Sequence, residues 1–125
     1  MRRQVLECIA HELDLTINRD EVRELEDKLI NDFDHFYADI DGEEYRFINE
    51  DYIWEIYKDE IQQVTEECYF DGTKLNKLWW LAIDWEQTAE NCYNADGYGH
   101  HFGIYDGNEY EYKIGDSLYY IFRTN

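Results

Sequence analysis

The residues of this chain whose type and spacing could support a function are carboxylates that recur along two predicted helices between Asn18 and Tyr69. Apolar residues on each helix follow spacings of three or four, so the acids between them fall on the opposite side. At a rise of about 1.5 Å per residue, acids four apart stand roughly 6 Å from one another, close to the step between neighbouring phosphates of one DNA strand. Such rows could replace phosphates on a basic protein surface.

The candidate partner-binding residues are these acids and two aromatic residues near the start of the second helix. The acids are Asp20, Glu24, Asp27 and Asp34 on the first helix, and Asp51, Glu55, Asp59 and Glu66 on the second. Tyr52 and Trp54 are expected at the rim, where desolvated aromatic side chains would supply binding energy that charge alone does not. Arg23, Lys28 and Lys58 are the cations that intervene, so the rows are poorly compensated.

Two amphipathic helices are needed to position these rows. The first begins at Asn18, which has Glu21 three residues later in the spacing of a capping box. Its apolar stripe is Val22, Leu25, Leu29, Phe33 and Phe36. The second helix begins near Asn49, and its stripe is Ile53, Ile56, Tyr57, Val64 and Cys68. We therefore expect Leu29, Phe33, Ile53 and Val64 to be nearly inaccessible and both acid rows to be exposed.

The remaining segments predict an α+β fold of about four helices followed by a three-stranded antiparallel β-meander. A short helix is expected over 2–13, a turn over 39–44, a short strand or a linker over 45–48, and a helical segment from Thr73 that breaks at Ile83–Asp84. From Gly97 the apolar period changes to two, with strands around 102–104, 110–114 and 119–123. The prediction is one acidic domain over 1–125, helical over 1–95 and a β-meander over 98–125.

Composition restricts the class of partner. The 125 residues carry a net charge of −19 from 30 acids and 11 Lys and Arg, while 44% of the residues are hydrophobic, so a folded acidic domain is expected. The charge argues against direct binding to nucleic acid or to anionic membranes, because phosphate contacts need cations. No segment reaches transmembrane length, and Cys8, Cys68 and Cys92 are read as buried free thiols of a reducing compartment, which predicts a cytoplasmic protein.

Catalytic and metal-binding patterns are weak in this sequence, and we predict no enzyme, no cofactor and no metal site. His100 and His101 are adjacent, so on the strand expected there they would point to opposite faces. The acidic turn at 39–44 does not fit a calcium loop, because Tyr37 and Ile48 stand where that loop needs its first and last carboxylates. Abundant carboxylates bring some pair together by accident, which makes acid pairs poor evidence for a hydrolase.

The C-terminal third resembles a family of small mobile-element proteins. The resemblance rests on Ile83-Asp84-Trp85-Glu86-Gln87-Thr88-Ala89-Glu90, on Asp96-Gly97-Tyr98-Gly99-His100-His101-Phe102, and on Tyr119-Tyr120-Ile121-Phe122-Arg123. These segments are similar to those of ArdA-type anti-restriction proteins. The resemblance implies an acidic DNA mimic that occupies the DNA-binding groove of a type I restriction-modification enzyme. The acidity of residues 1–70 is similar in character to that of Ocr-type phage DNA mimics.

The sequence therefore predicts a binding inhibitor of a basic, DNA-handling host enzyme, most simply a restriction-modification enzyme or another phage-defence nuclease. If phage-encoded, it would act in the host cytoplasm. An immunity or anti-CRISPR type of inhibitor would use the same acidic face, and the sequence does not separate the two. The same composition also fits a small acidic phage protein with no mimic role, or a small carboxylate-metal hydrolase. A tyrosine-rich edge strand such as Leu118 to Phe122 would be able to pair two copies as a homodimer.

Overall fold

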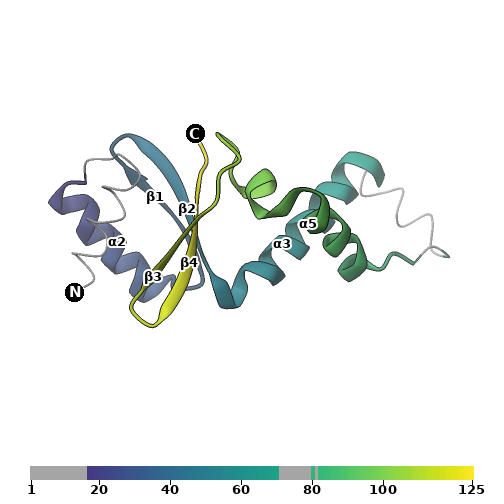
Figure 1. Cartoon of the computed structure of the whole chain (residues 1–125), viewed down its shortest axis with the longest axis horizontal. Helices are drawn as coiled ribbons and strands as arrows, with labels where there is room; N and C mark the ends of the chain where they lie inside the picture. The colour runs from purple at the N-terminus through teal and green to yellow at the C-terminus, as the bar shows by residue number, and fades with distance from the viewer. Residues whose placement is uncertain (1–16, 71–79, 81) are drawn as a thin grey trace. The chain divides into compact units, whose positions relative to one another are not determined.

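The computed structural model describes residues 17–70, 80 and 82–125 of the chain (Figure 1). Its elements, in chain order, are α2 (Arg19–Asn31), β1 (His35–Ile40), β2 (Glu43–Asn49), α3 (Glu50–Thr65), the π-helical turn η1 (Glu66–Phe70), α5 (Trp85–Phe102), β3 (Tyr110–Ile114) and β4 (Ser117–Arg123). The helix predicted over 2–13 and the helical start predicted at Thr73 lie outside the described residues. The chain divides into two compact units, one formed from 1–52 and 98–125 and the other from 53–97.

The first unit contains a four-stranded antiparallel sheet in the order β1-β2-β4-β3. Two short hairpins build it: β1 pairs with β2 so that Ile40 faces Glu43, and β3 pairs with β4 so that Ile114 faces Ser117. The hairpins join through β2 and β4, whose register runs from Tyr45 opposite Arg123 to Asn49 opposite Tyr119. This joining of distant segments places β4 in the interior of the sheet.

The core of the first unit lies between α2 and one face of this sheet, along which α2 runs in Figure 1. Alternate strand residues point to the same face, so both hairpins send one set of side chains towards the helix. The buried residues are Val22, Leu25 and Leu29 from α2, and Phe36, Ala38, Ile40, Tyr45, Phe47, Ile114, Tyr119 and Ile121 from the strands. The apolar stripe of α2 is therefore confirmed through Leu29.

A buried arginine occupies the opposite face of the sheet. The Arg46 side chain donates from Nε to His35 Nε2 at 2.7 Å, and its guanidinium lies 4.8 Å from the ring centroid of Phe102 and 5.3 Å from that of Tyr37. Contacts with two aromatic rings favour the desolvated cation. Phe102 also packs against Phe122 of β4, so the last turn of α5 covers this face.

The second unit consists of most of α3, η1 and the first part of α5. Tyr57 and Ala89 are buried, and Trp54 and Tyr93 pack around Tyr57, with Trp54 stacked on it and Tyr93 edge-on to it. Burial raises the pKa of Tyr57 to about 12. Aromatic packing thus holds α3 and α5 together in this unit.

The predicted fold was wrong in its sheet, although the α+β class holds broadly. The described residues form three α-helices and a four-stranded antiparallel sheet, instead of about four helices and a three-stranded meander. The start of β1 lies in the segment predicted to be helical, whereas the turn predicted over 39–44 is confirmed, and β2 covers residues 45–48, for which a short strand was one of the two expectations. The turn of the hairpin of β1 and β2 is Asp41-Gly42, where both residues have positive φ, at 54° and 77°. Asp-Gly between two strands is the sequence preferred for a two-residue hairpin turn, and this signal identifies the hairpin that was missed.

The first helix was predicted to continue to Phe36 but ends at Asn31. Phe36, Ala38 and Ile40 alternate with exposed residues and are buried as strand residues, so a period of two replaces the helical period. Among the expected core residues, Leu29 and Ile53 are buried as predicted, whereas Phe33 is 50% exposed and Val64 is 45% exposed. Phe33 follows the helix end, which explains why the helical stripe fails there.

The predicted β-meander was correct for two strands and wrong for the first. Tyr110–Ile114 and Ser117–Arg123 form the expected hairpin. Phe102 instead ends α5, and Ile104 is exposed in the turn that follows. His100 and His101 accordingly lie in the last turn of α5 and not on a strand. The helix start predicted at Asp84 is confirmed, because Asp84 Oδ1 accepts from Gln87 N–H at 3.1 Å just before α5, whereas the helix predicted to precede it lies outside the described residues.

Candidate functional site

The acid row of the first helix lies on the solvent side of α2. Asn18 and Glu21 form the predicted capping box: Asn18 Oδ1 accepts from Glu21 N–H at 2.8 Å, and Glu21 Oε1 accepts from Asn18 N–H at 3.1 Å. This cap fixes where the helix begins, and the buried apolar stripe fixes its rotation about its axis. The three exposed acids of the row are Asp20, Glu24 and Asp27.

Compensation of this row by cations is slight. Lys28 Nζ lies 3.4 Å from Glu24 Oε1, which makes one solvent-exposed ion pair. Lys28 Nζ also donates to the carbonyl oxygen of Tyr37, so the cation is shared with the backbone of β1. Within the described part of the chain, Asp20 and Asp27 make no ion pair. The row therefore presents two carboxylates with no ion-pair partner among the described residues and a third, Glu24, that is partly compensated.

Asp34 does not belong to the row on α2. The helix stops at Asn31, and the Asp32 N–H then bonds to the Lys28 carbonyl oxygen at 2.8 Å. Asp34 lies in the turn before β1, where its carbonyl oxygen accepts from Asn49 N–H at 2.9 Å. Its side chain is exposed. The helical spacing that placed Asp34 beside Asp27 is therefore wrong, because the chain turns into a strand between them.

The second acid row lies on α3 and η1. Asn49 precedes α3 and accepts from Asp51 N–H at 2.9 Å, which confirms the predicted helix start. Asp51, Glu55 and Asp59 are exposed. Glu66 lies in η1, is half-buried, and accepts from Gln62 Nε2 at 3.1 Å. Asp51 falls in the first unit and the other three acids in the second.

Lys58 is the cation that compensates this second row. Its Nζ lies 3.0 Å from Glu55 Oε2 and 3.0 Å from Glu86 Oε2 on α5. The indole nitrogen of Trp54 donates to the other Glu86 oxygen at 2.9 Å. The hydrogen bonds from Lys58 and then Trp54 lower the pKa of Glu86, and those to Glu86 and Glu55 raise the pKa of Lys58. Asp59 forms no ion pair in the residues that the structure describes.

The two expected aromatic anchors are in different situations. Tyr52 is 39% exposed, and its ring meets Phe33 edge-on with 5.8 Å between the ring centroids. Trp54 is half-buried and held between its bond to Glu86 and its stacking on Tyr57. Within the described part of the chain, the Tyr52 hydroxyl makes no hydrogen bond that binding to a partner would have to break. Trp54, in contrast, already contacts Glu86 and Tyr57.

Neither the family models nor the proteins of known function nor the solved structures include a match to this chain. What the candidate site can bind is therefore inferred from the charge, exposure and contacts of its own residues.

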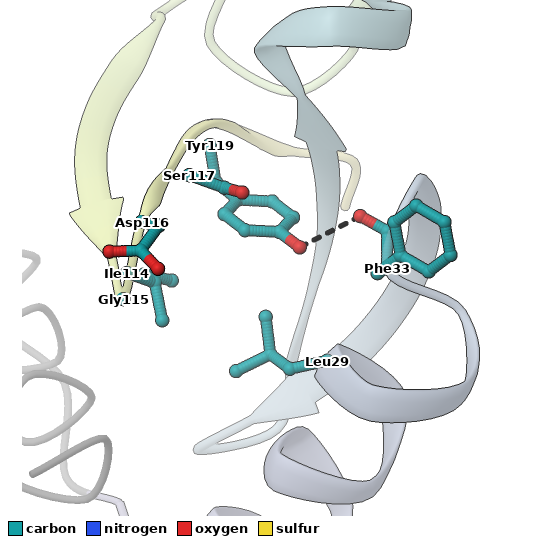
Figure 2. A pocket seen from close by; sticks show the side chains of 7 residues that line it. All are labelled: Leu29, Phe33, Ile114, Gly115, Asp116, Ser117 and Tyr119. Carbon is teal, nitrogen blue, oxygen red and sulfur yellow. Dashed lines mark hydrogen bonds between the residues drawn. The ribbon is translucent and has the colours of Figure 1, made fainter.

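A cavity of about 270 Å³ lies in the first unit, beside the end of α2 (Figure 2). Its lining comes from α2, the turn after it and the hairpin of β3 and β4: Leu29, Phe33, Ile114, Gly115, Asp116, Ser117 and Tyr119. Figure 2 shows the Tyr119 hydroxyl directed at the Phe33 carbonyl oxygen, to which it donates at 2.7 Å. Among the described residues that line the cavity, Ser117 is the one with the nucleophile of a serine hydrolase, and none of them is a histidine.

The described regions contain no assembled metal site. No group of three or more His, Cys, Asp or Glu side chains there is arranged to hold a metal ion. The described cysteines, Cys68 and Cys92, are free, but Cys68 is exposed and Cys92 is intermediate, so the prediction of buried thiols was wrong for these two. Cys8 lies outside the described residues. Among the described helices, none combines the length and the apolar character that crossing a membrane requires.

Sequence reasoning missed two exposed apolar residues, Ile104 and Tyr105, which lie after the end of α5. They are 75% and 59% exposed, and the Arg123 guanidinium lies 3.7 Å from the ring centroid of Tyr105. The apparent period of two assigned this segment to a strand, which concealed them. The Gly103 and Gly107 that flank the segment are the signal of a turn that could have identified it.

Proposed function

We propose that this protein is an acidic DNA mimic that inhibits a basic, DNA-handling enzyme by occupying its DNA-binding groove, with a type I restriction-modification enzyme as the leading target. The observation that carries this proposal is the presence of exposed carboxylates at helical spacing that lack ion-pair partners among the described residues. Asp20 and Asp27 on α2, and Asp51 and Asp59 on α3, are of this kind. The net charge of −19 supplies the long-range attraction to a basic surface.

The mechanism would be occupancy of the groove. Carboxylates take the positions of phosphates opposite the Lys and Arg side chains of the enzyme, and both partners release counterions. Long-range attraction accelerates the encounter, and Tyr52 adds an aromatic contact close to the start of α3. No residue is given a catalytic role. Because two polyanions cannot share one basic groove, inhibition should be competitive with DNA.

The two rows lie mainly in different units, so each is tested by its own variant. The α2 variant is D20N/E24Q/D27N and the α3 variant is D51N/E55Q/D59N. A control variant, D39N/E90Q/D116N, removes the same number of charges from exposed acids outside the rows. All three variants therefore have equal net charge, and a difference between them reports the position of the charge. Circular dichroism would establish that each variant is folded.

The assay is binding to a purified type I restriction-modification enzyme in competition with a labelled DNA duplex, at several salt concentrations. Loss of three phosphate-like contacts should weaken the inhibition by roughly tenfold or more for the row that is used, and should reduce its dependence on salt. The control should lose much less. Equal weakening by all three variants would mean that net charge alone drives the association. A ternary complex in which DNA binds at full affinity would reject mimicry.

If the wild-type protein leaves the restriction-modification enzyme active but inhibits a different phage-defence nuclease, an immunity or anti-CRISPR role replaces the leading target. Row variants tested on that nuclease would then show whether the same acids are used. A wild-type protein that binds no basic DNA-handling enzyme, at low salt and at high concentration, would reject the proposal as a whole.

A further inference from the structure

The sheet of the first unit has two outer strands among those that the structure describes, β1 and β3. The strand predicted to pair two copies, Leu118 to Phe122, is part of β4, which lies between β2 and β3. Its backbone groups are used on both sides, so it is not available for pairing with another chain. The outer strands carry backbone N–H and C=O groups that face away from the sheet, and these are the groups that can accept another strand.

The edge formed by β1 is already occupied. The Tyr37 carbonyl oxygen accepts from Lys28 Nζ, and His35 N–H donates to the Asp32 carbonyl oxygen at 3.2 Å. A lysine placed over an edge strand is one of the ways in which proteins prevent strand addition. The edge formed by β1 is therefore protected by α2 and by the turn that follows it.

The outward backbone groups of β3 follow from its turn. Ile114 and Ser117 flank the two-residue loop Gly115-Asp116, so their backbone groups bond to each other and those of Ile114 point towards β4. The direction of the backbone N–H and C=O groups alternates along a strand. The backbone groups of Tyr112 and Tyr110 therefore also point towards β4, whereas those of Glu111 and Lys113 point away from the sheet. The same rule applied to β1 places the Tyr37 carbonyl outward, where Lys28 meets it. Glu111 and Lys113 have no ion-pair partner among the described residues, and both are exposed.

We propose that two copies of this chain pair through β3, antiparallel and centred on Tyr112. In this arrangement Glu111 of each copy faces Lys113 of the other, and these two residue pairs exchange backbone N–H···O=C bonds across the new edge. Their side chains form two cross-strand ion pairs on one face, while the two Tyr112 residues face each other at the centre. The four-stranded sheets of the two copies become one continuous sheet with a twofold axis, the symmetry that most homodimers adopt.

Charge selects this register over its neighbours. Only residues with outward backbone groups can form hydrogen-bonded pairs across the edge, so the register shifts in steps of two. The shift in one direction places Glu111 opposite Glu111, and the shift in the other places Lys113 opposite Lys113. Like charges directly opposite are destabilising. The sequence Glu111-Tyr112-Lys113 is therefore complementary to itself in one antiparallel register.

The size and charge of the interface determine the strength of the dimer. β3 is five residues long, so the area buried is small and the association belongs to the weak, concentration-dependent class. Each copy carries −19, and this repulsion opposes association at low ionic strength. Added salt should therefore strengthen the dimer up to moderate concentrations, the opposite of its effect on binding to a basic enzyme. The inference is independent of the proposed function.

Sedimentation equilibrium of the full chain from about 10 µM to about 1 mM covers the range expected of a weak dimer. Two single variants, E111K and K113E, each place like charges opposite each other when a copy pairs with itself. Each should raise the dissociation constant of its homodimer by about tenfold or more. The double variant E111K/K113E exchanges the two charges and restores opposite pairs, so its dimer should return to wild-type strength.

A mixture of the two single variants makes the test sharper. E111K carries two cations on the edge and K113E carries two anions, so the two chains should form a heterodimer while each alone stays monomeric. Circular dichroism of each variant would establish whether the exposed substitutions leave the fold intact. A wild-type chain that remains monomeric throughout the concentration range at moderate salt would overturn the proposal. A dimer unaffected by either single variant, or a mixture that does not associate, would overturn it equally.

Discussion

Replacement of Leu25 by Ala tests the core of the first unit and the positioning of the first acid row. Leu25 is 1% exposed and packs among the residues between α2 and the sheet. Truncation of a fully buried leucine removes its transfer free energy and leaves a cavity, so the free energy of unfolding should fall by about 3 kcal/mol. At about 2.1 cal/mol/K per residue, the unfolding entropy of the 125-residue chain at its midpoint is about 0.26 kcal/mol/K. Dividing the loss of about 3 kcal/mol by this entropy predicts that Tm falls by about 11 °C.

The matched control is Val64→Ala. The helical period assigned Val64 to the core, but the structure leaves it 45% exposed on α3. An exposed substitution to the best helix former should change the free energy of unfolding by no more than about 0.5 kcal/mol, or about 2 °C in Tm. Both variants are followed by thermal unfolding with far-UV circular dichroism and calorimetry. If Val64→Ala lowers Tm as much as Leu25→Ala does, the buried face of α3 is assigned incorrectly.

Three further outcomes are expected. Asn18→Ala removes the capping box of α2 and should cost about 1 kcal/mol in urea unfolding, whereas Asn94→Ala on exposed α5 should cost nothing; equal losses would contradict the role of the cap. Because Lys58 and Trp54 lower the pKa of Glu86, the folded state gains stability from its carboxylate above the ordinary pKa and loses that gain as pH falls through the lowered value. The Tm difference between the wild type and Glu86→Gln should therefore be largest at neutral pH and shrink on acidification, with Glu90→Gln as the control; a difference that does not change with pH would contradict this linkage. Raising NaCl from about 0.02 M to about 0.3 M should increase Tm, because salt screens the self-repulsion of a net charge of −19. A Tm that does not change with salt concentration would show that cations already compensate the acids.

The candidate site could be predicted in part from local signals. Exposure of Asp20, Glu24 and Asp27 follows directly from the helical period of the residues buried beneath them, so the sequence predicted the exposure of these three acids correctly. The placement of Asp34 on the first helix was wrong, because the spacing of Phe33 and Phe36 fits a helix as well as it fits the approach to a strand. The bond of Trp54 to Glu86 joins residues 32 positions apart, and no local pattern reports it.

The sequence by itself determined where several elements begin and turn. The caps at Asn18 and Asp84 and the hairpin of β3 and β4 depend on residues within a few positions of each other, and each was predicted correctly. These features are decided by backbone groups that must be satisfied locally. The Asp41-Gly42 turn carried an equally local signal for the hairpin of β1 and β2.

The tertiary structure alone decided how the two hairpins join. β2 pairs with β4 across about seventy residues of chain, with Asn49 opposite Tyr119, and this pairing turns β4 into an interior strand and leaves β3 at the edge. No periodicity encodes such a pairing, because its stability comes from apolar side chains that both hairpins bury together against α2. Tertiary contacts also decide which residues of a helical stripe are buried: Val64 is 45% exposed despite its place in the stripe of α3, since a stripe is buried only where another element covers it.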